Sequence, residues 1–410
     1  MLNVMWIALF LITFLVALLR LIFFHDYAVF SSILQSTFSS SSQAFEIALN
    51  LTGAMTLWLG IMNIGEKAGA IRILSRLIGP FFSRLFPQIP KDHPALGQII
   101  LNFSANMLGL GNAATPMGLK AMQSMQELNE DKERASNSQI MFLVINTAGF
   151  ALIPVSIMVY RAKFHAANPA DVFIPILLAT LFSTFAGVLM VGIRQRIKLW
   201  DPVLLLWTLG IGTVIGAVIY AASHLTMAQL SAASSFASSF ILFGIIIAFI
   251  SLGAYKKIDV YSTFIEGAKE GFLTVIKLIP YIVAMLVGVA VFNAAGCMEY
   301  VQKGLTSMLV FIGCPTDMVP AIPTAFIRPL SSSGASAMTV DIINHSGVDS
   351  FPARLSSIIQ GSSDTTFYII ALYFGSVGIK KTRYAITFGL LTDLCGFIAA
   401  IFMAYLFFKH

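Results

Sequence analysis

The stretch Gln360-Gly-Ser-Ser-Asp-Thr-Thr366 places one carboxylate and five uncharged polar side chains near the start of an apolar run that extends to about residue 379. A second apolar run is interrupted in the same manner by Asn146-Thr-Ala-Gly-Phe150. Polar groups inside hydrocarbon cost several kcal/mol unless they are paired or functional. The two stretches therefore predict spans that unwind and present polar atoms at membrane depth.

The composition of the whole chain is that of a membrane protein. The 410 residues are 57% hydrophobic and only 11% charged, whereas soluble domains carry about a quarter charged residues. The net charge of +6 comes from Lys and Arg that lie between apolar runs, which is typical of membrane orientation signals. We therefore expect an all-α polytopic protein whose partner is the lipid bilayer and not a nucleic acid.

Apolar runs long enough to cross a bilayer as helices occur along the whole sequence. Two other stretches, about 95–122 and 320–345, are broken by small and polar residues and are predicted to be re-entrant hairpins. Residues 69–86 and 300–313 are predicted to be amphipathic helices at the membrane interface. The nine predicted transmembrane helices are 3–24, 44–64, 138–160, 172–193, 202–222, 236–254, 273–296, 358–379 and 384–408.

The order of these elements occurs twice. Span, amphipathic helix, hairpin, broken span and span follow one another in 44–193 and again in 273–408. Gly111–Met117 in the first hairpin aligns with Ser332–Met338 in the second. The broken spans align through Asn146-Thr-Ala-Gly-Phe150 and Ser363-Asp-Thr-Thr-Phe367. The sequence thus predicts two structural repeats.

Parity and charge predict that the two repeats are inverted. Two spans separate them, so the second repeat starts on the side where the first one ends. Residues 65–92 contain five Lys and Arg, whereas the equivalent 297–319 contain only Lys303. Loops 25–43 and 222–236, both predicted to be external, contain none. We expect a protein of the bacterial inner membrane with a cytoplasmic N-terminus and an external, periplasmic C-terminus.

Polar residues gather at the hairpin tips and in the broken spans, where glycines allow the backbone to unwind. Half-helix ends would then direct their dipoles at the membrane midplane, as in transport sites. Packing of helices through small residues is the alternative explanation for any single serine. The candidate substrate-binding residues are Asn102, Asn106, Asn112, Thr115, Asn146, Thr147, Arg328, Ser331, Ser332, Ser333, Gln360, Ser362, Ser363, Asp364, Thr365 and Thr366.

Asp364 is the most informative of these residues, because a carboxylate within a span must be paired, protonated or bound to a cation. We expect it to couple Na⁺ or H⁺, with Na⁺ bound near its carboxylate. The alternative is a structural ion pair with Arg328. Asp393 lies alone in an apolar run and is predicted only to make a packing hydrogen bond. No cofactor and no metal site beyond Na⁺ is expected, since the three cysteines are scattered.

Two long motifs carry a resemblance to a known family. Asn102-Phe-Ser-Ala-Asn-Met-Leu-Gly-Leu-Gly-Asn-Ala-Ala-Thr-Pro-Met117 and Gln360-Gly-Ser-Ser-Asp-Thr-Thr-Phe-Tyr-Ile-Ile370 resemble spore maturation proteins A and B. The resemblance divides the chain into an A-like half at 1–200 and a B-like half at 201–410. It implies the nucleoside recognition Gate domain, which is similar to parts of concentrative nucleoside transporters and of ferrous-iron transporters.

Secondary transport of a small polar, nucleoside-like solute by alternating access is the leading hypothesis. A non-transporting scaffold or sensor with the same fold, acting in the envelope or in spore maturation, is the alternative. An intramembrane hydrolase using Ser331–Ser333 ranks last, because no His or Lys is placed as a base. We expect no enzyme activity and no ATP-driven mechanism. Small residues on several spans permit a homo-oligomer but do not require one.

The predicted orientation can be tested with topology reporters. A reporter enzyme that is active only outside the cytoplasm should be active when fused after residue 230 and inactive after residue 128, because the intervening spans place these positions on opposite sides. Enzyme activity in intact cells is the measurement, with expression level as the control. The reverse pattern would invert the whole topology.

Overall fold

The computed structural model describes residues 2–90, 92–108, 111–152, 154–224, 227–313 and 315–409. Within these ranges the chain is helical, without strands, as predicted; an isolated bridge joins Arg134 to Lys381. The helices before the middle of the chain are α1 (Leu2–Phe24), α2 (Val29–Ala68), α3 (Ala70–Leu85), α4 (Pro94–Met107), α5 (Gly111–Glu127), α6 (Asn137–Ala148), α7 (Val155–Lys163), α8 (Phe173–Arg194) and α9 (Pro202–His224). Those after it are α10 (Met227–Tyr255), α11 (Val260–Ala294), α12 (Cys297–Ile312), the 3₁₀ helix η1 (Val319–Ala321), α13 (Ile322–Ile327), α14 (Ser332–Ser346), α15 (Phe351–Gly361), α16 (Thr366–Ser376) and α17 (Ala385–Phe408).

Apolar helices of spanning length support a membrane protein. Among the described residues, three helices are long and apolar enough to cross a bilayer: Trp6–Phe24, Phe173–Arg194 and Ala385–Phe408. Shorter apolar segments lie at Pro202–Val218 and Ser239–Tyr255. The number of nine spans, the re-entrant depth of the hairpins and the interfacial position of α3 and α12 stay predictions.

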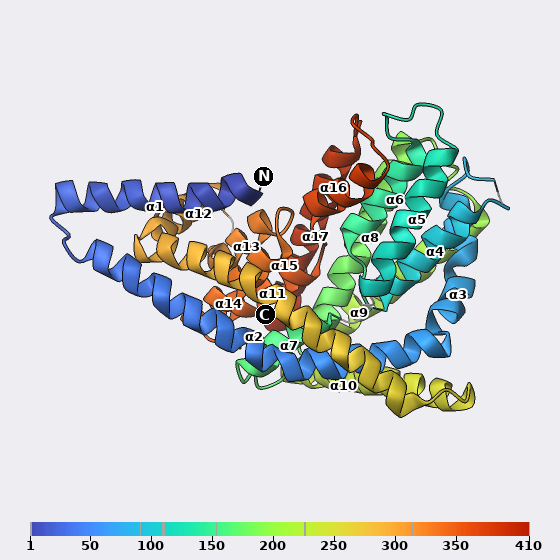
Figure 1. Ribbon diagram of the computed structural model, residues 1–410, viewed down its shortest axis with the longest axis horizontal. Coiled ribbons are helices and arrows are strands. Elements are labelled where there is room, and N and C mark those ends of the chain that lie inside the picture. The colour runs from blue at the N-terminus through green and yellow to red at the C-terminus, as the bar shows by residue number, and fades with distance from the viewer. Residues whose placement is uncertain are drawn as a thin grey trace.

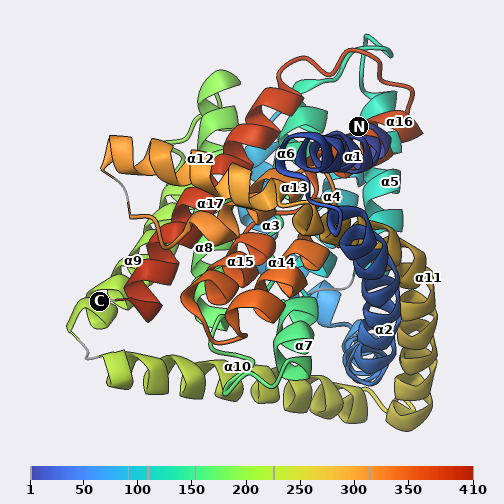
Figure 2. The same cartoon turned by 90° about the vertical axis from the view of Figure 1, so that its left-hand side faces the viewer.

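The longest helices, α2 and α11, run side by side through the molecule in opposite directions (Figures 1 and 2). Their contacts pair Met55 with Gly271 and Leu59 with Gly267. A Cβ atom on Gly267 would lie 2.5 Å from the carbonyl oxygen of Leu59, so the two backbones meet where glycine recurs at a spacing of four. At 40 residues α2 is about 60 Å long, which exceeds a hydrocarbon layer of about 30 Å. Its full length would therefore fit within a membrane only at a steep tilt.

The predicted loops 25–43 and 222–236 are mostly helical, and that part of the prediction is wrong. Helix α2 begins at Val29. Helix α9 extends to His224, and α10 begins at Met227. The extra helical turns of α2 bury Val29 and Ser40, and the ring of Phe30 contacts that of Phe14 in α1, with centroids 6.0 Å apart. Tertiary contact therefore overrides the low helix preference of the serine-rich sequence.

Both predicted broken spans are interrupted in the structure. The first consists of α6 and α7, and α6 ends where Gly149 takes a left-handed conformation with φ +64°. The second consists of α15 and α16, separated by residues 362–365. Each predicted hairpin is a pair of helices in contact, α4 with α5 and α13 with α14. Ser331 caps the start of α14, since its Oγ accepts from the amide of Gly334 at 3.0 Å.

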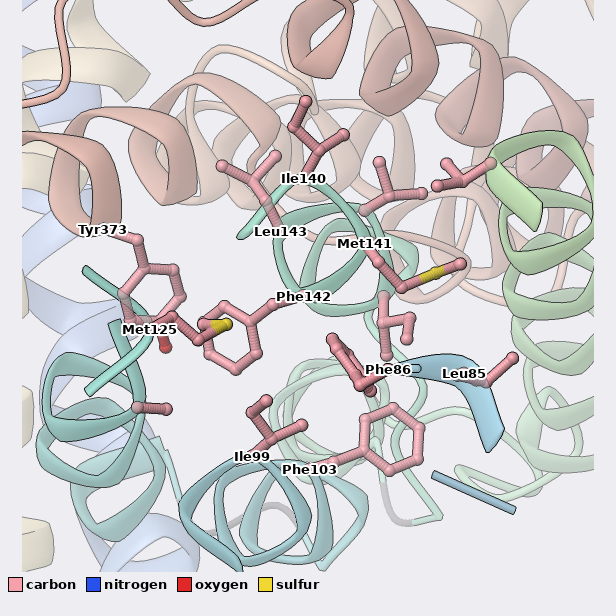
Figure 3. Close-up of a cluster of buried hydrophobic side chains, with 14 of the residues drawn as sticks. Leu85, Phe86, Ile99, Phe103, Met125, Ile140, Met141, Phe142, Leu143 and Tyr373 are labelled. Carbon is pink, nitrogen blue, oxygen red and sulfur yellow. The ribbon is translucent and has the colours of Figure 1, made fainter. Parts of the chain in front are cut away.

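A large apolar cluster fixes the first hairpin against the rest of the protein (Figure 3). Phe86 follows α3, Phe103 belongs to α4 and Phe142 to α6. Tyr373 of α16 joins them, with its ring centroid 5.1 Å from that of Phe142. An element of the second half of the chain thus completes the core around the first hairpin.

Several polar links connect the halves of the chain, α1–α8 and α10–α17, and two of them are centred on Arg161 and Lys380. Buried Arg161 donates to Val348 O at 2.9 Å and contacts both Asp171 at 2.9 Å and Asp349 at 3.0 Å. The second link is exposed and joins Lys380 to Glu133 at 2.6 Å. Topology predicted from the sequence assigns the first link to the external side and the second to the cytoplasmic side.

These links should differ in their contribution to stability. Arg161→Met leaves the buried Asp171 with Arg354 as its remaining cation and Val348 O without its donor, and should lower the free energy of unfolding by about 2–4 kcal/mol. Lys380→Met removes an exposed pair and should cost about 0–1 kcal/mol. Thermal unfolding of the purified variants in detergent measures the difference, with wild type as the control. Equal midpoints for the two variants would contradict the structural assignment.

Candidate functional site

The two broken spans meet at one backbone hydrogen bond. The amide of Asp364 donates to the carbonyl oxygen of Thr147 at 2.8 Å. Gly149 makes this approach feasible, because a Cβ there would lie 2.7 Å from the Asp364 nitrogen. The bond satisfies a carbonyl at the C-terminal end of α6 that has no partner within its own helix. Thr147 and Asp364 are also aligned positions of the two sequence repeats, so equivalent points of the two broken spans touch.

Each hairpin is tied to the broken span that follows it in sequence by an analogous backbone bond. In the first half the amide of Leu152 donates to Met107 O, at the end of α4, at 2.7 Å. In the second half the amide of Phe367 donates to Pro329 O, just after α13, at 3.1 Å. The ends of interrupted helices thus satisfy one another, as they must where water is excluded.

Arg328 connects the second hairpin to the second broken span. Its Nε donates to Ser363 O at 2.9 Å, Nη2 donates to the same oxygen, and Nη1 donates to Ser332 Oγ at 2.8 Å. The guanidinium also lies 3.7 Å from the Asp364 carboxylate, whose side chain is 48% exposed. The ion pair considered from the sequence is therefore present. A cation at the C-terminal end of α15 also complements the helix dipole.

Polar residues of the first hairpin contact both halves of the chain. Asn102 donates to Ala114 O at 2.8 Å and to the Tyr373 hydroxyl at 3.3 Å. Asn106 donates to Asn146 Oδ1 at 2.9 Å, so the end of α4 faces the end of α6. Thr115 is half-buried on α5. The side chain of Asn112, also a predicted site residue, lies outside what the structure describes.

Residues of the second hairpin and α15 form a separate polar group. Gln360 donates to Ser336 Oγ at 2.6 Å, which joins α15 to α14. Ser331 and Ser333 lie 3.2 Å apart through their hydroxyl oxygens at the hairpin turn. Ser362 donates back to Ile359 O at 2.9 Å and so closes the last turn of α15. Most of the predicted residues thus lie around the place where the two broken spans meet, here called the crossing. Gln360 and the serines of the second hairpin lie on its α14–α15 side.

Asp393 belongs to this site although the sequence analysis assigned it only a packing role. It projects from α17, is 1% exposed, and its Oδ2 accepts from Thr366 Oγ1 at 2.5 Å. The Ser363 side chain faces the same carboxyl. A packing hydrogen bond is therefore present, but its partner is a predicted site residue. Tyr373 was likewise not predicted, and its contact with Asn102 depends on a helix fold that no local pattern reveals.

Several buried oxygens of the site have no hydrogen-bond partner among the described residues. Backbone and neighbouring side chains leave these acceptors free, and hydroxyls among them can also donate. Such atoms suit a polar solute, an ion or water more than an empty core. The oxygens are Asn102 Oδ1, Thr147 Oγ1, Gln360 Oε1, Ser363 Oγ, Thr365 Oγ1 and Asp393 Oδ1.

A cavity of about 80 Å³ lies beside the first hairpin, but its lining is almost wholly apolar. Phe103 and Met107 of α4, Phe150 and Trp207 of α9 contribute to the wall. A polar solute would lose its hydrogen bonds there. The cavity is thus distinct in chemistry from the polar crossing.

Comparison with known proteins assigns the family. A model of the Gate family, described as "Nucleoside recognition", matches residues 48–164 and 275–380, more than half of the chain. The chain belongs to the Gate family. Each matched Gate segment contains one hairpin and one broken span, whereas α8 and α17 lie outside both. Asp393 is therefore a feature next to the Gate segments and not within them.

Two curated relatives support the resemblance predicted from the motifs. The chain is 38% identical over 190 residues to spore maturation protein A of Bacillus subtilis (strain 168), covering 46% of this chain and 93% of that protein. It is 46% identical over 165 residues to spore maturation protein B of the same organism, covering 40% of this chain and 91% of that protein. No solved structure matches. The boundary between the halves at residue 200 stays a prediction.

The close crossing of the Gate segments depends on the absence of a side chain at Gly149. Gly149→Ala should lower the free energy of unfolding by about 2–4 kcal/mol, because it strains a left-handed residue and pushes a methyl group into the Asp364 backbone. Gly97→Ala in α4 is the matched control, since its Cβ would meet nothing within 4 Å. Thermal unfolding measures both. A neutral Gly149→Ala would show that the two broken spans are not in contact.

Proposed function

We propose that this protein is a secondary, ion-coupled transporter of a small polar solute, with nucleoside-like compounds as the first class to test. The observation that carries the proposal is the Thr147–Asp364 bond between equivalent positions of two interrupted spans. Around it lie helix ends and unpartnered oxygens, the elements from which transporters build midplane sites. Na⁺ or H⁺ would supply the driving force.

Alternating access would follow from two inverted repeats, and several contacts support this arrangement. The equivalent helices α2 and α11 are antiparallel. The equivalent α8 and α17 also cross, with Ser183 Oγ donating to Thr392 O at 3.0 Å. In addition α1 packs on α11 and α10 packs on α2, so each long helix also contacts a second helix of the opposite half. We therefore extend the repeats from the predicted cores, 44–193 and 273–408, to include α1 and α10.

The polar links at Arg161 and Lys380 suit the two gates that such a mechanism requires. The first joins α7 of one half to the α14–α15 loop of the other, the second joins two loops, and both are closed here. We propose that opening one link while the other stays closed exposes the crossing to one side of the inner membrane at a time.

A second candidate function is a Gate-fold scaffold or sensor that binds a ligand or a protein without moving solute. The names of the two relatives favour it, since they refer to spore maturation and to no transported compound. Close packing at Gly149 and the apolar character of the cavity beside α4 also suit a protein that stays closed.

Counterflow into proteoliposomes separates these functions. Vesicles preloaded with nucleosides, nucleobases, amino acids or dicarboxylates should accumulate the labelled form of at least one compound. Asn106→Ala removes the bond to Asn146 and should reduce the exchange about fivefold to tenfold, as expected for one hydrogen bond of about 1 kcal/mol. Ser39→Ala is the control, because this exposed hydroxyl bonds only to Ser36 O within α2. Ligand binding without any exchange would favour the scaffold or sensor.

A further inference from the structure

The carboxyl of Asp393 has an environment unlike that of any other site residue. It lies in the middle of α17, a helix of 24 residues with no other charged residue. Thr366 donates to one carboxyl oxygen, and the other has no hydrogen-bond partner among the described residues. Within the same ranges no cation lies within ion-pair distance of it. An ionised carboxylate here would be both buried and unpaired, which is strongly unfavourable.

The charged groups that face Asp393 are Arg328 and Asp364. Arg328 is held elsewhere, because three of its nitrogens donate to Ser363 O and Ser332 Oγ. The negative charge of the Asp364 carboxylate opposes a second negative charge on Asp393. The other helices that pack on α17 are α6, α8, α9, α10 and α15. Among the described residues they bring no ionisable group to this carboxyl.

Packing beside Asp393 is close on both sides along α17. Gly389 and Gly396 lie on the same face of α17, one turn before and after it. A Cβ on Gly389 would be 2.9 Å from the methyl carbon of Thr366, and one on Gly396 would be 2.9 Å from Ser362 O. A coordinated cation would need several oxygen ligands arranged around it, whereas a proton neutralises the carboxyl without adding volume.

We propose that Asp393 is the proton-binding residue of this protein, and that its protonation controls the hold of Arg328 on the second hairpin. The proposal rests on the proposed transport function and replaces Asp364 as the coupling residue. Ser363 lies between the two groups, with its carbonyl bound to Arg328 and its hydroxyl facing Asp393.

The structure then corresponds to the protonated, neutral form of Asp393. When the proton leaves to water, along the half-exposed edge at Asp364, a negative charge appears on the far side of Ser363. It attracts the guanidinium away from Ser332 and Asp364, and so loosens the contact of α14 with the α15–α16 break. Return of a proton from the other side of the membrane restores the original bonds. One proton is taken up and one released in each cycle.

Infrared spectroscopy of the purified full-length protein tests protonation without requiring transport. Wild type should show the C=O stretching band of a buried protonated carboxyl at neutral pH, and Asp393→Asn should lose it. Asp341→Asn is the matched control, since Asp341 is a second helical aspartate hydrogen-bonded to an amide, Asn293, at 2.8 Å. This control should keep the band. If Asp393→Asn fails to fold, Asp393→Glu should move the band in frequency and thereby assign it.

Other infrared outcomes overturn the proposal. A band that keeps its full intensity in Asp393→Asn, or no such band in wild type, shows that Asp393 is not the protonated group. A band that disappears when Na⁺ replaces choline at constant pH shows a sodium site instead. In proteoliposomes, solute accumulation driven by a pH gradient should fall in Asp393→Asn to the level seen without a gradient. Absence of any solute exchange by wild type would reject the transport function, while the infrared result would still decide the proton site.

Discussion

Hydrogen bonding of backbone groups at interrupted helices is the constraint on which this fold depends. A helix that stops inside the protein leaves amides and carbonyls that water cannot reach. Three backbone bonds meet this requirement: Leu152 to Met107, Phe367 to Pro329, and Asp364 to Thr147. The first two tie each hairpin to its own broken span, and the third ties the spans together. The positions of polar side chains at the crossing follow from these bonds.

Electrostatics at the crossing extends the same logic to side chains. The guanidinium of Arg328 caps the end of α15 through Ser363 O, and Asp364 balances its charge from a half-exposed position. Asp393 approaches the same residue from α17 but receives only the hydroxyl of Thr366. A small set of residues from three elements thus shares one unit of positive charge. A change of charge on any member must alter the bonds of the others.

Local sequence patterns revealed the interrupted helices but not their surroundings. Gly149 and the run after Gln360 combine unwinding residues with polar groups in apolar segments, so both breaks were predictable. The helical start of α2 was not, because the stretch 29–43 is rich in serine and its packing includes the distant contact of Phe30 with Phe14 of α1. Asp393 was missed as a site residue for a related reason. Thr366 is 27 residues away in sequence, and only the packing of α16 on α17 brings the two together.

The contacts of α1 with α11 and of α10 with α2 have a consequence for assembly. The most extensive packing of each long helix is against the other, so each half alone would expose the surface, Gly267 and Gly271 included, that the other half covers. Joining both halves in one chain guarantees their equal number and raises their local concentration far above that of two independently made subunits.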